Sequence, residues 1–262
     1  MTTYCVVDHL GRMTSRPKNE LRPFAVTPHY IEHPEGSVLI ECGSTHVICT
    51  ASIDESVPRW MKDSGKGWVT AEYDMLPRAT SGRRPRDSHR GKVNGRTQEI
   101  SRLIGRALRS IVDLEALGER SVTVDCDVIQ ADGGTRTTSI TGAWIALHLA
   151  LQRLEEKTNG SVKVADVLRD NMAAISVGVV DGDVYLDLDY DLDSRADVDM
   201  NIVMTGKGEL AEVQGTGEES TYTRDQLNQM LDYAFEGLPK LVELQNKAIA
   251  QTFNRDRVRI VL

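Results

Sequence analysis

One junction in the sequence constrains the fold more than any other. The segment SVTVDCDVIQ, residues 121–130, alternates apolar and polar side chains, which is typical of a strand with one buried face. The segment ADGGTRTTSITG follows at residues 131–142 and opens into AWIALHLALQRLEE, which has the pattern of a helix. Glycine lets the backbone approach a ligand closely. The sequence therefore predicts a strand over 121–130, a glycine turn, and a helix over 137–156.

The rest of the chain alternates between hairpins and long helices. Paired strands around a turn are expected at 36–54, 173–190 and 199–215, with a further strand near 68–75. Apolar residues spaced by three and four predict one helix over 96–117 that ends at Gly118. A second helix over 221–253 has a Thr223 cap and an expected break near Gly237–Pro239. This order predicts a pseudo-repeated α+β body, followed by a tail from 254 that is either frayed or packed on a neighbour.

Charge is distributed very unevenly along the 262 residues. The net charge of −8 argues against a protein that coats nucleic acid with its whole surface. Residues 78–109 nevertheless carry ten Lys or Arg against two acidic residues, a local charge of +8 that leaves −16 for the remainder. Residues 181–199 carry eight Asp and one Arg. Each of these two segments needs its own explanation.

Two predicted helices begin with a glycine and an arginine. The first begins NGRTQE, with Arg96, and the second begins GGTRTT, with Gly134, Thr135 and Arg136. Helix N-termini expose unpaired N–H groups and the positive end of the dipole, and an arginine fork matches two phosphate oxygens. We therefore expect these residues to bind one phosphate. The alternative is that each segment is only a turn with an N-cap.

The acidic segment DLDYDLDSRADVDMN predicts a divalent-cation site. Strand alternation would place Asp187, Asp189 and Asp191 on one face, where a solvated, aggregation-resistant strand edge explains them equally well. Asp193 and Asp199 flank a loop that can bring them together. Paired carboxylates beside a phosphate site suit Mg²⁺, which combines one or two carboxylates with substrate oxygens and water. For this pair the alternative is again a solvated acidic loop.

The basic segment RATSGRRPRDSHRGK, residues 78–92, has arginines but no aromatic side chains. Arginines without aromatic partners are suited to the phosphodiester backbone of a nucleic acid rather than to its bases. Arg78, Arg83 and Arg86 are therefore candidates for contact with RNA, and a solvated loop is the alternative.

The remaining composition indicates a cytoplasmic protein. Four cysteines, at positions 5, 42, 49 and 126, lack zinc spacing and are expected to be reduced thiols half-buried in strands. His148, on an apolar helix face, is expected to pack in the core. No apolar run reaches the roughly 18 residues of a membrane span, and the start MTTYCVVDHLG lacks the pattern of a secretory signal.

At this point the sequence resembles the ribonuclease PH family. The matching strings occur in family order over about residues 20–250: ELRP, EGSVLIECGSTHVICTASI, VPRW, GWVTAEYDMLPRAT, GRTQEISRLIGRALR, DCDVIQADGGTRTTSITGA, DSRADVDMN and EVQGTGE. The resemblance implies a ribosomal protein S5 domain 2-like α+β fold, with two pseudo-repeated βαβα halves forming one compact domain. We accordingly divide the chain into an extension 1–17, a domain 18–253 with halves at about 20–158 and 170–253, and a tail 254–262.

The resemblance also implies an activity and its residues. Members of the family are phosphorolytic 3′→5′ exoribonucleases that trim nucleotides beyond the CCA end of tRNA precursors, release nucleoside diphosphates and assemble as a homohexamer, a trimer of dimers. Phosphate ligands would be Arg96, Gly134, Thr135 and Arg136, with Asp193 and Asp199 holding Mg²⁺ or Mn²⁺ and Arg78, Arg83 and Arg86 contacting RNA. Leu192 departs from the acidic residue common there. Two alternatives are an inactive RNA-binding ring subunit and a metal-dependent hydrolytic nuclease.

Overall fold

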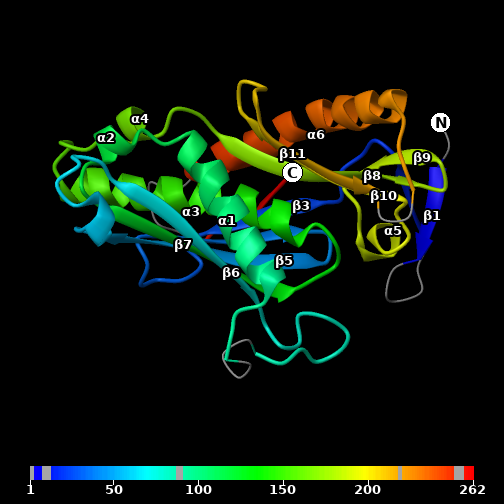
Figure 1. The fold of residues 1–262 in the computed structure, drawn as a ribbon, viewed down its shortest axis with the longest axis horizontal. Coiled ribbons are helices and arrows are strands. Elements are labelled where there is room, and N and C mark those ends of the chain that lie inside the picture. Colours follow the sequence, from blue (N-terminus) through cyan, green and yellow to red (C-terminus); the bar gives the residue numbers. More distant parts are fainter. Residues whose placement is uncertain (1–2, 8–12, 87–90, 218–219, 251–256) are drawn as a thin grey trace.

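A long central helix separates two β-sheets (Figure 1). The computed structural model describes residues 3–7, 13–86, 91–217, 220–250 and 257–262, and the side chains among them from residue 16 onward. Helix α3, Thr135–Lys157, contacts β4, β5 and β7 on one side and β8 on the other. Sixteen of its 23 residues are buried, so this helix has no broad solvent face and forms the middle of the core.

The larger sheet has six strands in the order β12-β3-β4-β5-β7-β6. Its strands are β3 Phe24–Pro28, β4 Gly36–Cys42, β5 Thr45–Asp54, β6 Trp68–Met75, β7 Ser121–Gln130 and β12 Ile260–Val261. All neighbours are antiparallel except β6 and β7, which run parallel. Parallel neighbours need a crossover, and helix α1, Gly95–Ser110, lies in that connection and packs on β6.

The smaller sheet has four antiparallel strands in the order β11-β10-β8-β9. They are β8 Met172–Val180, β9 Asp183–Leu186, β10 Val198–Thr205 and β11 Leu210–Gly217. The long helix α6, Arg224–Ala250, packs on β8 and β9. Every residue of β8 is buried, because α3 and α6 both pack against this strand.

Short elements complete the description. They are a two-stranded hairpin of β1 Thr3–Val7 and β2 Met13–Pro17, a 3₁₀ turn at Arg59–Met61, and the one-turn helices α2 Leu114–Leu117, α4 Val164–Val167 and α5 Tyr190–Asp193. Among the described residues no helix is both long and apolar enough to cross a membrane.

Most of the predicted elements are confirmed. The three hairpins, the strand over 121–130 and the helix that follows it are present. Thr223 caps α6, because its Oγ1 accepts a hydrogen bond of 3.2 Å from the amide of Gln226. Cys42, Cys49 and Cys126 are free, as expected, but they are fully buried rather than half-buried, and the side chain of Cys5 lies outside the described part. His148 lies in the core stacked on Trp144, and burial lowers the pKa of this imidazole to about 4.

The prediction of one helix over 96–117 was wrong. Helix α1 ends at Ser110, and a separate turn of helix, α2, begins at Leu114. Between them Val112 forms a β-bridge with Leu168, and the Asp113 side chain caps α2 by accepting hydrogen bonds from two amides. The apolar spacing continues through this break because both helices bury residues against the same core.

The expected break near Gly237–Pro239 was also wrong. Helix α6 runs without interruption from Arg224 to Ala250, with Pro239 inside it. Gly237 and Leu238 are buried whereas Pro239 is exposed, so the ring of Pro239 faces solvent while its neighbours pack. Burial of this helical face outweighs the loss of one backbone hydrogen bond.

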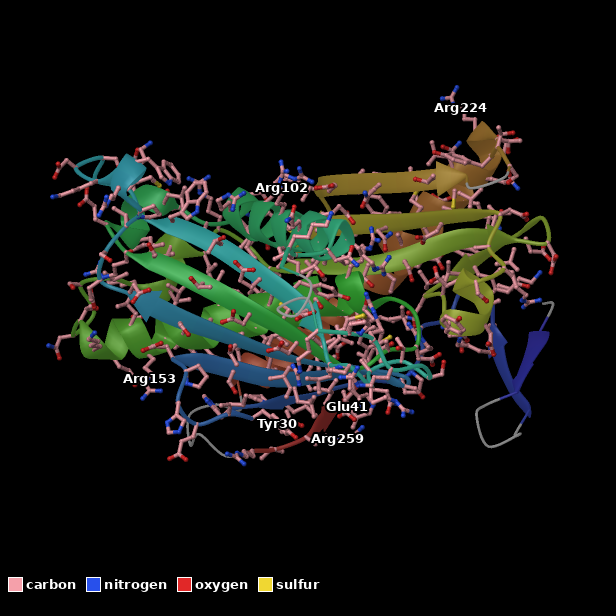
Figure 2. The ribbon with its side chains drawn as sticks, turned by 60° about the horizontal axis from the view of Figure 1, so that its bottom comes forward. Tyr30, Glu41, Arg102, Arg153, Arg224 and Arg259 are labelled. Carbon is pink, nitrogen blue, oxygen red and sulfur yellow. The ribbon has the colours of Figure 1, made fainter. Side chains whose placement is uncertain are left out.

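The tail is neither frayed nor packed on a neighbour in its described part, residues 257–262. Strand β12 pairs antiparallel with β3 and becomes an edge strand of the larger sheet. Nε of Arg259 donates a hydrogen bond of 2.8 Å to Glu41 on β4, and Figure 2 shows these two side chains together. Residues 254–256 of the tail and 251–253 of the predicted helix lie outside the described residues.

Candidate anion and carboxylate site

The site begins at the glycine turn between β7 and α3. Gly133 and Gly134 both have left-handed φ angles, of 72° and 65°. A Cβ atom on Gly133 would lie 2.5 Å from the carbonyl oxygen of Leu188, so only glycine fits there. Gly134 is the N-cap of α3, and no side chain caps that helix. The first amides of α3 are therefore available to an anion.

Thr135 and Arg136 form the first turn of α3. Thr135 is buried, and the hydroxyl of Tyr73 on β6 donates a hydrogen bond of 2.9 Å to its Oγ1. Nη1 of Arg136 donates a 3.1 Å hydrogen bond to Oε1 of Gln214 on β11 and lies 3.5 Å from Oε1 of Glu99 on α1. The guanidinium of Arg136 thus lies among three elements that are distant in the sequence.

Arg96 lies at the start of α1, where Oδ1 of Asn94 accepts a 3.0 Å hydrogen bond from its backbone N–H. Its side chain is exposed. Burial raises the pKa of Tyr73, whereas the Thr135 hydrogen bond and then the charges of Arg96 and Arg136 lower it. Both arginines therefore lie close enough to Tyr73 to act on the same hydroxyl. The two helix starts meet where Arg136 of α3 contacts Glu99, three residues after Arg96 in α1.

Asp199 lies on β10, and Asp193 is the last residue of α5. Asp199 is half-buried and Asp193 is exposed. Burial, followed by the charge of Asp193, raises the pKa of Asp199 to about 6, although Arg136 and Arg96 act in the opposite direction. The charge of Asp193 is thus the second cause, after burial, that disfavours ionisation of Asp199. The charges of Asp193, Arg136 and Arg96 therefore all act on the Asp199 carboxylate.

The carboxylate pair suits a divalent cation that the substrate helps to hold. No group of three or more His, Cys, Asp or Glu side chains in the described part of the chain is arranged to bind a metal unaided. Mg²⁺ commonly keeps several waters and takes only one or two protein carboxylates, with phosphate oxygens as further ligands. Two carboxylates that repel one another would gain from a cation between them.

The other predicted acidic residues do not share a strand face, because β9 ends at Leu186. Asp187 is 2% exposed, has a φ angle of 57°, and is ion-paired with Arg22. Asp189 is the N-cap of α5, and Asp191 is exposed within it. The prediction of a common face was wrong because the chain turns sharply at Asp187. The explanation of Asp187 as a solvated edge residue was wrong too.

Arg78, Arg83 and Arg86 lie in the connection between β6 and α1, which extends away from the body in Figure 1. All three are exposed, and Nη2 of Arg78 donates a 3.3 Å hydrogen bond to the carbonyl of Ser81. Residues 87–90 of the basic segment lie outside the described residues. These three arginines are therefore exposed in one connection, where a long polyanion can reach them.

Several residues of the site were missed by sequence reasoning. Tyr73, Glu99 and Gln214 contact Thr135 or Arg136, and Arg84 acts electrostatically on Tyr73. Arg22 holds the glycine turn from behind. Some of these residues stand in the strings ELRP, TAEY and EVQG, but spacing alone gives no sign that such distant segments meet.

The topology is that of the ribosomal protein S5 domain 2-like fold, and arginines at helix starts beside paired carboxylates are typical of phosphate chemistry. Models of the 3′ exoribonuclease family match the chain twice, domain 1 at residues 20–151 and domain 2 at residues 170–237. The chain belongs to this family, the ribonuclease PH family.

Named relatives agree with that assignment, and solved structures share the fold. Ribonuclease PH of Bacillus cereus (strain AH187) is 58% identical over 240 residues, which cover 91% of this chain and 96% of the relative. Ribonuclease PH of Bacillus anthracis (strain A0248) gives the same values. Rice Rrp46 has a TM-score of 0.71 at 18% identity, covering 89% of this chain and 98% of that one. The Archaeoglobus fulgidus exosome with RNA bound to the active site has a TM-score of 0.71 at 22% identity, with coverages of 88% and 90%.

Proposed function

We propose that this chain is a phosphate-dependent 3′→5′ exoribonuclease that trims nucleotides beyond the 3′-CCA of tRNA precursors and releases nucleoside 5′-diphosphates. Family membership supports the reaction type. The observation that carries the assignment to this site is that the start of α3, with Arg136, contacts Glu99 near the start of α1, where Arg96 lies. Such a site can hold an anionic nucleophile beside an anionic substrate.

Inorganic phosphate needs no activation by a protein nucleophile, because its own oxygen attacks the last phosphodiester of the RNA. The obstacle is the repulsion between two anions. Arg96 and Arg136 would neutralise and orient the attacking phosphate, while the backbone at Gly134 and the Thr135 hydroxyl fix its oxygens. Preorganised donors of this kind lower the barrier because they need not reorganise during the reaction.

Asp193 and Asp199 would hold Mg²⁺ or Mn²⁺. When bound, the cation supplies charge stabilisation for the scissile phosphate and the departing 3′ oxygen. Since the bonds broken and formed are nearly equal in energy, the reaction is reversible, and added nucleoside diphosphate should extend RNA.

Arg78, Arg83 and Arg86 would grip the RNA backbone upstream of its 3′ end. Their exposure in the connection between β6 and α1 supports this role. Contacts with phosphates alone carry little base specificity, as a trimming enzyme requires.

Assembly, location and domain limits belong to the same proposal. We take the functional form to be a cytoplasmic homohexamer, a trimer of dimers, as the family implies. The extension 1–17 and the tail 254–262 would flank a domain at 18–253, with halves at about 20–158 and 170–253. The two family-model matches, at 20–151 and 170–237, support that division.

One assay tests the function. The protein is incubated with a tRNA bearing extra 3′ nucleotides and Mg²⁺, with and without inorganic phosphate, and the released nucleotide is identified. The proposal requires nucleoside diphosphate, formed only when phosphate is present. Nucleoside monophosphate formed without phosphate would indicate the hydrolytic nuclease, and RNA binding without any product would indicate an inactive ring subunit.

A further inference from the structure

The glycine turn at the anion site is held from behind by two side chains. Nη1 of Arg22 donates a 2.5 Å hydrogen bond to the carbonyl of Asp132, and Nη2 lies 3.5 Å from the carbonyl of Gly133. Oγ1 of Thr45 donates a 2.7 Å bond to the same Gly133 carbonyl and accepts one of 2.8 Å from the amide of Asp132. The carbonyl oxygens of Asp132 and Gly133 are thus tied to Arg22 and Thr45.

Holding these carbonyls also sets the direction of two amides. In a trans peptide the C=O and N–H bonds point in opposite directions. The carbonyl of Asp132 shares a peptide with the amide of Gly133, and the carbonyl of Gly133 shares one with the amide of Gly134. Both amides therefore face away from Arg22 and Thr45. Neither donates to another group in the described part of the chain. Successive amides of this kind form an anion-binding concavity.

Arg22 is itself fixed by a buried carboxylate. The residue is 6% exposed, and Asp187 accepts hydrogen bonds from its Nη2 at 2.7 Å, its Nε at 3.0 Å and its backbone N–H at 2.8 Å. Arg16 adds a 2.7 Å bond to the backbone carbonyl of Asp187. The charge of Arg22 holds the pKa of Asp187 at about 2, although burial opposes this. The pair therefore remains ionised, and the guanidinium has little freedom to move.

The guanidinium lies directly behind the turn. A Cβ atom on Gly134 would lie 3.0 Å from Nη2 of Arg22. The guanidinium packs against one side of the glycine turn, whereas the Gly133 and Gly134 amides face the other side. Arg22 therefore does not contact a phosphate bound by these amides at the helix start. Its effect on that ligand has to pass through the peptides that it holds.

We propose that Arg22 and Thr45 are positioning residues for inorganic phosphate: by fixing the Asp132 and Gly133 carbonyls, they aim the Gly133 and Gly134 amides at the ligand. This inference rests on the proposed function, because it takes the anion to be the phosphate co-substrate. It adds two residues that do not touch the ligand, and it assigns the buried Arg22–Asp187 pair a role in binding as well as in folding.

The test is the Kd of inorganic phosphate for the RNA-free full chain, measured by calorimetry alongside the melting temperature. Thr45→Val removes the hydroxyl while keeping the shape, and Thr45→Ser keeps the hydroxyl. We expect Thr45→Val to weaken phosphate binding by roughly three- to tenfold, the scale of one lost hydrogen bond, and Thr45→Ser to restore it. Equal Kd values for wild type and a folded Thr45→Val protein would overturn the inference.

A second variant separates positioning from folding. Arg22→Met combined with Asp187→Asn removes both charges of the buried pair, which avoids the instability caused by removing one partner alone. Arg16 loses its 3.4 Å ion pair with Asp187 but keeps its hydrogen bonds to the backbone carbonyls of Glu20 and Asp187. We expect this double variant to fold and to bind phosphate at least tenfold more weakly. Lys18→Gln is the control, because it breaks a nearby ion pair, with Asp183, that does not touch the turn. A double variant with wild-type phosphate affinity would show that the buried pair serves folding alone.

The binding readout also separates this inference from the proposed function. Wild-type protein that binds phosphate but releases no nucleoside diphosphate would contradict the function, while the variants would still decide the role of Arg22 and Thr45. Wild-type protein that binds no phosphate would contradict both.

Discussion

Arg136 has a carboxylate beside it: its Nη1 lies 3.5 Å from Oε1 of Glu99. Gln214 contacts both side chains, at 3.1 Å from Arg136 and 3.4 Å from Glu99. This triangle joins α3, α1 and β11 and sets the direction of the guanidinium. It also means that an incoming phosphate competes with Glu99 for the charge of Arg136.

Glu99→Gln should therefore tighten phosphate binding. The glutamine keeps an acceptor for Arg136 but removes a negative charge from the edge of an anion site. We expect KM for phosphate to fall several-fold, with a smaller change in KM for RNA, in steady-state phosphorolysis at low salt. An increase in KM for phosphate would show that Glu99 acts mainly by orienting Arg136.

Arg136→Ala should lower the rate of phosphorolysis by several hundredfold or more. The loss of a preorganised charge contact has effects of this size on turnover. Arg169→Ala is the matched control, because Arg169 forms an exposed ion pair with Asp113 outside the site. Near-normal product release by the Arg136 variant, at saturating phosphate, would refute its assigned role.

Much of the fold follows from local sequence pattern. The strand over 121–130 alternates buried and partly exposed residues along most of its length, as its alternating apolar and polar side chains predict. The break at Val112 was not predictable, because it depends on a bridge to Leu168, 56 residues later in the sequence. Apolar periodicity indicates which residues face the core. It does not reveal where one helix ends and another begins if both bury residues against the same core.

The site divides in the same way. Helix-start arginines and paired aspartates have local signatures, and the charges of Arg96, Arg136 and Asp193 all act on Asp199. Arg22 carries no such signature, since a lone arginine before a proline is compatible with any surface loop. Its role depends on Asp187, a partner 165 residues away. A single sequence does not show which two charged residues, far apart along the chain, form a buried ion pair.

Helix α6 offers a test of the fold that is independent of the site. Pro239 is exposed within α6 and gives no N–H to the helix. Pro239→Ala restores that donor, although alanine also increases the conformational freedom of the unfolded chain. We expect a net gain of about 1 kcal/mol or more in the free energy of unfolding, measured by urea denaturation. A loss of stability would mean that the helix is built around the proline.

Arg83 and Arg86 can be tested by salt dependence. Each phosphate contact on a single strand contributes about 0.7 to the slope of log K against log salt concentration. Replacing both arginines with glutamine should weaken RNA binding and make the slope shallower by about 1.4. A control protein with Arg153 and Arg169 changed to glutamine loses the same charge elsewhere. An unchanged slope in the first variant would show that the projecting segment does not hold the RNA backbone.

Asp199→Asn should abolish activity and yet stabilise the metal-free protein at neutral pH. The pKa of Asp199 is raised to about 6 in the folded state, above the value of about 3.9 for an unfolded chain, so the native state binds more protons between these values. The contribution of Asp199 to the free energy of unfolding of the wild type therefore rises as the pH falls through 6. At pH 7 the ionised carboxylate lowers that free energy by an amount on the order of 1–2 kcal/mol. Asparagine removes that cost.

The stability gained over wild type, measured by urea denaturation in EDTA, should be largest above pH 7 and vanish near pH 4. Asp197→Asn, an exposed change two residues away, should give no such gain. A gain that is equal at both pH values would show that the asparagine acts through packing, and the repulsion between Asp193 and Asp199 would then lose its support.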